Sequence, residues 1–286
     1  SALVMVSPQG EIANLDYQTL TYTSVDIAEP ADPNVTFWRD ISAPTLSVTD
    51  FEYDSGRLYV AGLSNGEFAS TLRTISYPFD TSVETTSIEM FHTAHNQNET
   101  RAPIRAMAMV DLDGAKTMVA AYTCTPLVTI PVDALDDGAH VVGNTVAELG
   151  YGNRPLEVLS LTAYNMERQP EQFVLVINRE MSANLIKLED LAAAPALTEP
   201  FAALGDTLGV DGTHIPFAGI LQADDQDAQF ILTLRRNIDT GDVDLISSMK
   251  GVYFRLSDFV SEYTFPDYTY AENQAGTQMI HKMKNP

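Results

Sequence analysis

The sequence predicts an all-β protein, a β-propeller of four-stranded antiparallel blades. Two observations favour this fold. Short apolar strands alternate with turns rich in Gly, Pro and Asp throughout the chain. Strand–turn–strand pairs also recur about every 50 to 60 residues, a period typical of propeller blades that carry loop insertions. A β-sandwich would turn often as well, but it would not show this longer period.

The N-terminal half contains the clearest hairpin. Residues 48–53 and 57–63 alternate apolar and polar side chains around an Asp-Ser-Gly turn, as a half-buried antiparallel pair should. Before it, residues 3–6 and 11–15 are predicted to form strands around a Pro-Gln-Gly turn, and residues 17–27 to continue the sheet. After it, strands are predicted at 68–77 and 88–92.

The same plan recurs later in the chain. Its further copies are predicted at 104–110 with 117–122, at 156–163 with 172–178, and at 215–222 with 229–235. Additional strands are predicted at 127–132, 145–149, 184–188, 243–249 and 252–256. Residues 190–204 contain two prolines, so we expect at most short helical turns there.

Four copies and the N-terminal strands give about five blades, which form a complete ring or part of a larger one. We expect a single domain over residues 1–286, with an irregular tail at 258–286. The sequence begins without an initiator Met, which we interpret as a processed or incomplete chain. The strand at 3–6 is expected to close the ring by covering a sheet edge.

Composition excludes several partners. The net charge of −23, from 39 acidic and 16 basic residues, repels nucleic acid and anionic membranes. No apolar run approaches the roughly 18–20 residues that span a bilayer, so no membrane insertion is expected. A single cysteine excludes an internal disulfide framework. We expect a protein partner or a small-molecule ligand instead.

Chemically useful residues gather between Ile88 and Pro131. His92 and His95 are three residues apart, which places them on opposite faces of a strand but lets them converge in a turn. With the Cys124 thiolate they would suit copper or zinc, and Glu99 could add an oxygen ligand. The alternative is that both histidines make ordinary hydrogen bonds and that the cysteine is a small buried hydrophobe.

Arginines form a second candidate set. Arg101, Arg105 and Arg154 lie near the starts of predicted strands, where they could line a propeller channel or its mouth and bind a carboxylate ligand. Alternatively, they pair with neighbours such as Glu99 or Glu148 and fasten adjacent blades.

Acidic turns give a third candidate. Residues 111–114, 224–227 and 239–242 resemble fragments of calcium-binding loops, although none has the full EF-hand spacing. Asp and Gly also fit turn dihedrals, which explains such turns without a metal. The sequence contains no P-loop, Rossmann fingerprint or His-Glu-x-x-His motif.

Four segments read Val-Ala-Gly-Leu-Ser-Asn at 60–65, Glu-Thr-Arg-Ala-Pro-Ile-Arg at 99–105, Ala-Ala-Tyr-Thr-Cys-Thr-Pro-Leu-Val at 120–128 and Asn-Arg-Pro-Leu at 153–156. These segments resemble a group of uncharacterised bacterial proteins of the periplasm or cell surface. The group is broadly similar in layout to the heavy subunits of quinoprotein amine dehydrogenases. The resemblance implies a propeller-like fold and a periplasmic or extracellular location, and it transfers no catalytic residue.

Two functional hypotheses follow. In the first, the chain is a secreted binding or interaction module, including the case of a non-catalytic subunit in a redox assembly. In the second, it is a metal-dependent oxidoreductase or lyase whose site at the channel mouth uses the histidines, the cysteine and the arginines.

Overall fold

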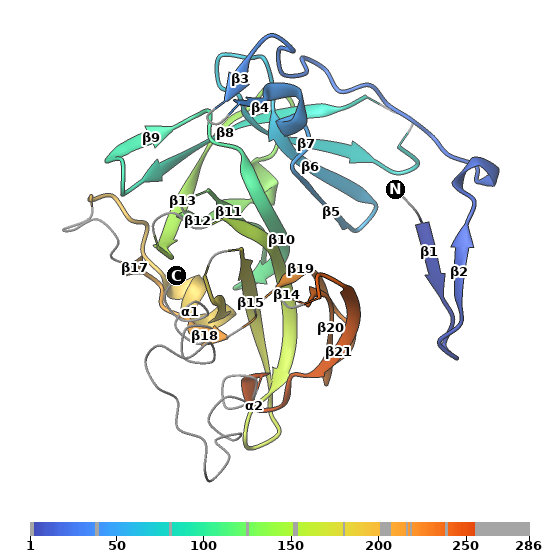
Figure 1. Cartoon of the computed structure of the whole chain (residues 1–286). Coiled ribbons are helices and arrows are strands. Elements are labelled where there is room, and N and C mark those ends of the chain that lie inside the picture. Colours follow the sequence, from blue (N-terminus) through green and yellow to red (C-terminus); the bar gives the residue numbers. More distant parts are fainter. Residues whose placement is uncertain are drawn as a thin grey trace.

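A computed structural model describes most of the chain (Figure 1). The described residues are 3–37, 40–79, 82–123, 126–150, 154–179, 181–200, 207–215, 217, 219–237 and 240–254. Nearly all their regular structure is β, which confirms the predicted all-β class. None of the helices in these ranges has the length and apolar run that a bilayer-spanning helix needs.

The strands form four successive antiparallel units, which we call meanders one to four. Meander one contains β5 (Asp50–Asp54), β6 (Arg57–Leu63), β7 (Ser70–Ser76) and β8 (Glu84–His92). Meander two contains β10 (Ile104–Leu112), β11 (Ala115–Tyr122), β12 (Pro126–Pro131) and β13 (His140–Glu148). Meander three contains β14 (Pro155–Tyr164), β15 (Pro170–Asn178), β16 (Ala183–Lys187) and β18 (Thr213–Ile215). Meander four contains β19 (Ile220–Asp225), β20 (Phe230–Arg236) and β21 (Val243–Met249).

Meanders one and two are joined into a single sheet. Their last strands, β8 and β13, pair in parallel, with His140 opposite Ser87 and Gly143 opposite Met90. With β9 (Gln97–Glu99) on β8 and β17 (Leu208–Gly209) on β13, this sheet has ten strands. Its two end strands, β5 and β10, lie against each other, so the sheet curls into a nearly closed, barrel-like shape.

Neighbouring meanders share their apolar cores. One cluster joins meanders one and two through residues such as Leu72, Ile88 and Met107. A second joins meanders two and three, and a third joins meanders three and four. The first strands of successive meanders also lie side by side, β5 with β10, β10 with β14 and β14 with β19 (Figure 1). Burial on both faces of the middle strands explains their continuous apolar runs.

The turn chemistry of the strongest hairpins agrees with the sequence. Ser55 and Gly56 connect β5 to β6 with φ angles of 51° and 85°, and Asp113 and Gly114 connect β10 to β11 with 52° and 83°. Two consecutive residues with positive φ form the type I′ turn that matches the twist of antiparallel strands.

The N-terminal segment departs in part from the prediction. β1 (Leu3–Val6) and β2 (Ile12–Leu15) pair as expected, but among the described strands they pair only with each other, so β1 does not cover an edge of a larger sheet as predicted. The predicted strand over 17–27 is wrong. A 3-10 turn, η1 (Tyr17–Thr19), forms there instead because the Asp16 side chain accepts a hydrogen bond from the Gln18 amide. β3 (Thr36–Phe37), β4 (Ile41–Ser42) and the 3-10 turn η3 (Ala43–Leu46) then lead into meander one.

Two further elements complete the described chain. α1 (Leu188–Ala193) agrees with the expected short helical turn, and 3-10 turn η4 (Val132–Ala134) follows β12. The predicted strand at 252–256 is wrong over its described part, where α2 (Gly251–Phe254) forms a helical turn. The buried Lys250 amide donates to Gln229, and the Phe254 amide donates back to the Lys250 carbonyl, which turns the chain off the sheet. The tail predicted at 258–286 lies outside the described residues.

Candidate metal centre

A tight strand reversal brings the two central histidines together. β8 ends at His92, and β9 returns antiparallel to it, with Glu99 opposite Met90. Within the turn, the His95 amide donates to the His92 carbonyl at 3.2 Å, and Asn96 adopts a φ of 49°. Asparagine tolerates this left-handed conformation better than most residues. Because His92 ends β8 and His95 lies in the turn that follows, the two histidines converge as the turn alternative of the sequence analysis expects.

Both imidazole rings face the same carboxylate oxygen. His92 Nδ1 lies 3.1 Å from Glu99 Oε1, and His95 Nδ1 contacts that oxygen more closely. The ring centroids of the two histidines are 4.1 Å apart. One ligand atom from each of the three residues lies within 4.8 Å of the others, close enough to surround one metal ion.

The cluster is closed on one side and open on the other. His92 is 2% exposed and Glu99 16%, whereas the His95 side chain is 48% exposed. A ligand could therefore approach from the side of His95, while His92 is fixed by the surrounding core.

Glu148 completes the closed side. Its side chain is 1% exposed, and Oε1 accepts a hydrogen bond from the Thr93 amide at 3.1 Å. The same oxygen lies 3.7 Å from His92 Nε2. Neither His92 Nε2 nor Glu148 Oε2 has a hydrogen-bond partner among the described residues, although both atoms are buried. Buried polar atoms are normally paired, so these two atoms stand out among the buried groups around the cluster.

The parallel pairing of β8 and β13 places Glu148 there. Thr145 Oγ1 donates to the Phe91 carbonyl at 2.6 Å and keeps β13 beside the end of β8. Glu148 then extends beneath the turn between β8 and β9. Sequence reasoning missed this role for Glu148. The available signal was an acidic residue within the otherwise apolar run 146–149, which is entirely buried.

The electrostatics differ between the two carboxylates. Burial opposes ionisation of Glu99, but hydrogen bonds from His92 and His95 outweigh it and lower its pKa to about 2. Burial raises the pKa of Glu148, and the proximity of His92 opposes this only in part. Glu99 is thus an anion at neutral pH, the state that a metal ligand requires.

The donor set has a clear chemical preference. Two imidazole nitrogens and one carboxylate oxygen suit zinc or copper, with bonds of about 2.0–2.2 Å. Such bonds put ligand atoms about 3.4 Å apart in a tetrahedral site, close to the 3.1 Å between His92 Nδ1 and Glu99 Oε1. Calcium prefers six to eight oxygens and fits this cluster poorly.

The other predicted residues lie elsewhere or outside the described part. Cys124 falls outside the described residues, so its place relative to the histidines is not defined. Arg101 is exposed in a bend after β9, whereas Arg105 on β10 is partly buried. Burial and the nearby Arg154 lower the pKa of Arg105, and Asp50 opposes this. The charges of Arg105 and Arg154 therefore act on each other.

The acidic turns serve the backbone. Asp111 Oδ1 accepts from the Gly114 amide, and Asp227 Oδ1 accepts from the amides of Gln229 and Phe230. These contacts are those of ordinary Asx turns. Asp239 lies outside the described residues, so the third turn is described only from residue 240.

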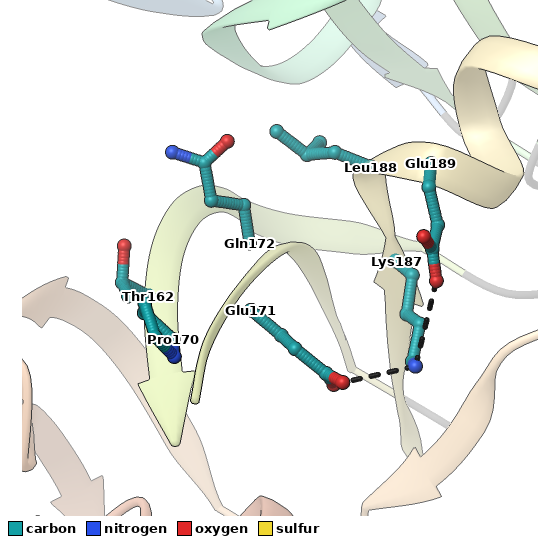
Figure 2. A pocket seen from close by; sticks show the side chains of 7 residues that line it. All are labelled: Thr162, Pro170, Glu171, Gln172, Lys187, Leu188 and Glu189. Atoms are coloured by element: carbon teal, nitrogen blue, oxygen red, sulfur yellow. Dashed lines mark ion pairs between the residues drawn. The ribbon is translucent and has the colours of Figure 1, made fainter. Parts of the chain in front are cut away.

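A large surface hollow lies away from the histidine turn, on meander three. It has a volume of about 490 Å³ and is lined by Thr162, Pro170, Glu171, Gln172, Lys187, Leu188 and Glu189. Figure 2 shows that its one lysine, Lys187, is already engaged by Glu171 at 3.3 Å and by Glu189 at 3.6 Å. The hollow thus offers no uncompensated cation, and the histidine cluster is the stronger candidate.

Comparison with known proteins adds no relative to these observations. No protein-family model matches the chain, and no curated protein matches it.

Proposed function

We propose that this chain is a metal-binding module of the bacterial periplasm or cell surface, built on a β-propeller scaffold. The convergence of His92, His95 and Glu99 carries the proposal. The location is supported by the resemblance of residues 60–65, 99–105 and 120–128 to bacterial envelope proteins.

The scaffold proposal treats the four meanders as blades around a common axis. It is supported by the contacts of β5 with β10, β10 with β14 and β14 with β19, since the first strands of propeller blades face the central channel. It is also supported by shared cores between successive meanders. The parallel pairing of β8 with β13 is then a bridge between the outer edges of two blades.

In this proposal, His92 Nδ1, His95 Nδ1 and Glu99 bind a zinc or copper ion. His92 Nε2–H would then donate to Glu148, its buried neighbour. Carboxylates commonly orient metal-binding histidines in this way. The arrangement would give the buried His92 Nε2 an acceptor in Glu148, whose Oε1 lies 3.7 Å away.

Metal binding can be measured on the full chain. Metal-free protein should bind one equivalent of Zn²⁺ or Cu²⁺ in isothermal titration calorimetry. His95→Ala should lower the affinity by at least about 100-fold because it removes a metal ligand. The fold should remain intact because the His95 side chain is half-exposed and contributes little to packing. Excess metal at about 100 times Kd should also stabilise the fold by about 2.7 kcal/mol.

A matched control removes a histidine outside the cluster. His214 hydrogen-bonds to Ser182, and His214→Gln should bind metal as the unmodified protein does. Less than about a tenth of an equivalent bound at saturation would refute the proposal, as would equal affinity for His95→Ala.

Glu148→Gln tests the orienting role. This substitution keeps the shape of the side chain but weakens its attraction for His92 Nε2–H. Affinity for Zn²⁺ should fall about 10- to 100-fold while the stoichiometry of one ion stays the same. Calorimetry at a fixed pH would measure both quantities, and an unchanged affinity would remove Glu148 from the site.

The exposure of His95 favours a second candidate, a metal-dependent oxidoreductase or lyase. Two histidines and one carboxylate on an open face leave positions for a substrate, as in non-haem iron oxygenases. Loading with Fe²⁺ and a screen for dioxygen consumption would separate this candidate from a binding module.

A further inference from the structure

A second polar cluster lies on the sheet where β8 and β13 pair in parallel. Ser87 Oγ is 2.8 Å from His140 Nδ1, and His140 Nε2 is 3.0 Å from Glu89 Oε2. Ser87 and Glu89 project from the same face of β8 because they are two residues apart. His140 is the direct neighbour of Ser87 across the parallel pair. These residues belong to neither the metal cluster nor the hollow of Figure 2.

The hydrogen bonds fix the direction of proton donation. The Glu89 carboxylate only accepts, so the proton of neutral His140 resides on Nε2. Nδ1 is then a lone-pair acceptor aimed at Ser87 Oγ, and the serine hydroxyl donates to it. The alternative acceptor for Ser87 Oγ, the Ala139 carbonyl, is more distant at 3.3 Å.

The histidine is held in this orientation from two sides. Glu89 Oε1 accepts a hydrogen bond from Asn98 Nδ2 at 2.6 Å, which fixes the carboxylate. The Phe68 ring packs on the imidazole with a centroid distance of 4.3 Å. A serine hydroxyl is activated when it hydrogen-bonds to a base and an acid orients that base through a second hydrogen bond.

We infer that Ser87 is an activated nucleophile that takes acyl groups from small esters, with His140 as general base and Glu89 as the residue that positions it. Ser87 and the His140 side chain are partly exposed, so a small substrate has access. Phe68 is 39% exposed and Val142 58% exposed, and they provide apolar surface around the cluster. An ester with a short apolar acyl chain fits this apolar surface.

The proposed reaction balances as ester hydrolysis. Ser87 Oγ attacks the carbonyl carbon, its proton passes to His140 Nδ1, and the C–O bond to the alcohol breaks as that proton is delivered to the leaving oxygen. Water then attacks the acyl–Ser87 carbonyl, with His140 taking the water proton. The bond to Ser87 Oγ breaks, His140 returns a proton to Oγ, and the carboxylic acid leaves.

Turnover should be slow because nearby amides are already engaged. The Ser87 amide donates to the Ala139 carbonyl at 3.0 Å, and the Gly138 amide donates to Thr85 at 2.9 Å. These amides cannot stabilise an oxyanion as well, and one such donor is worth about 100- to 1000-fold in rate. Both acylation and deacylation should therefore be slow, and a stable phosphonyl adduct is a better readout than turnover.

A fluorophosphonate probe tests the inference directly. The full chain would be treated with a small alkyl fluorophosphonate, and adduct formation would be followed by mass spectrometry of the peptide that contains Ser87. The probe phosphorus should bond to Ser87 Oγ with loss of fluoride. His140→Gln should slow labelling by about 100-fold or more, and Glu89→Gln by about 10-fold.

Ser160 is the internal control, because it is an exposed serine on β14 in the same molecule. It should remain unlabelled when Ser87 is modified. Labelling should persist after treatment with a chelator, which separates this site from the proposed metal centre. The inference is overturned if Ser87 reacts no faster than Ser160, or if folded His140→Gln, verified by circular dichroism, labels at the original rate.

Discussion

Replacing Lys250 with methionine is expected to lower the free energy of unfolding by about 3 kcal/mol. Lys250 is 1% exposed, and its Nζ donates to the Thr162 carbonyl at 2.7 Å and pairs with the Asp225 carboxylate. Methionine retains most of the apolar stem but removes both contacts. Urea denaturation followed by circular dichroism would measure the loss.

The expected magnitude reflects the location of the pair. Thr162 belongs to β14 and Asp225 to β19, so one ammonium group connects meanders three and four. Removing one partner of a buried ion pair costs about 3–5 kcal/mol, and we use the lower limit because the Asp225 side chain is 28% exposed.

Lys187→Met is the matched control. The Lys187 ammonium pairs with Glu171 and Glu189, but its side chain is 36% exposed and water screens both pairs. Surface ion pairs contribute about 0–1 kcal/mol, so this substitution should have a small effect. Equal losses for Lys187→Met and Lys250→Met would contradict the structural role assigned to Lys250.

The local hairpins could be predicted because their information lies within a few residues. The alternation around Ser55 and Gly56 indicates both strands and the turn, and the same holds around Asp113 and Gly114. The failures at 17–27 and 252–256 have local causes of another kind. At 17–27 the hydrogen bond to the Asp16 side chain redirects the backbone, and at 252–256 the burial of Lys250 does so. The alternation of apolar residues in the sequence does not reveal such contacts.

Long-range pairing could not be predicted in this way. The parallel register of β8 and β13 joins residues 53 positions apart, such as Ser87 and His140. Two consequences of that register, the position of Glu148 beside His92 and the contact between Ser87 and His140, were therefore not predicted from sequence. The cluster of His92, His95 and Glu99 was accessible because one local strand reversal, from the end of β8 through the turn to β9, contains all three residues.

The second large effect concerns acidic residues on the first strands of the meanders. Burial is the main cause that raises the pKa of Glu157 on β14 from 4.5 to about 7, and the charges of Asp50, Asp224 and Glu52 raise it further. These neighbours come from β5 and β19. The folded state therefore binds a proton at Glu157 that the unfolded state releases more easily.

The sign of the pH dependence follows from this difference. The favourable contribution of protonated Glu157 is fully present below about pH 4.5 and is lost as the pH rises through about 7. At 1.36 kcal/mol per pKa unit the loss would reach about 3 kcal/mol, and we expect about 1–2 kcal/mol because Glu157 is partly exposed. Glu157→Gln should therefore be more stable than the unmodified protein at pH 8 by about 1–2 kcal/mol, and equally stable near pH 4.

Urea titrations at several pH values would test this expectation, with Glu167→Gln as the control. Glu167 is exposed in the turn between β14 and β15, so its replacement should leave the pH profile unchanged. Part of the pH dependence of stability should remain in Glu157→Gln, because burial also raises the pKa of Asp50 to about 6. A profile that Glu157→Gln leaves intact would mean that neither burial nor the carboxylates of β5 and β19 raise the pKa of Glu157 in the folded protein.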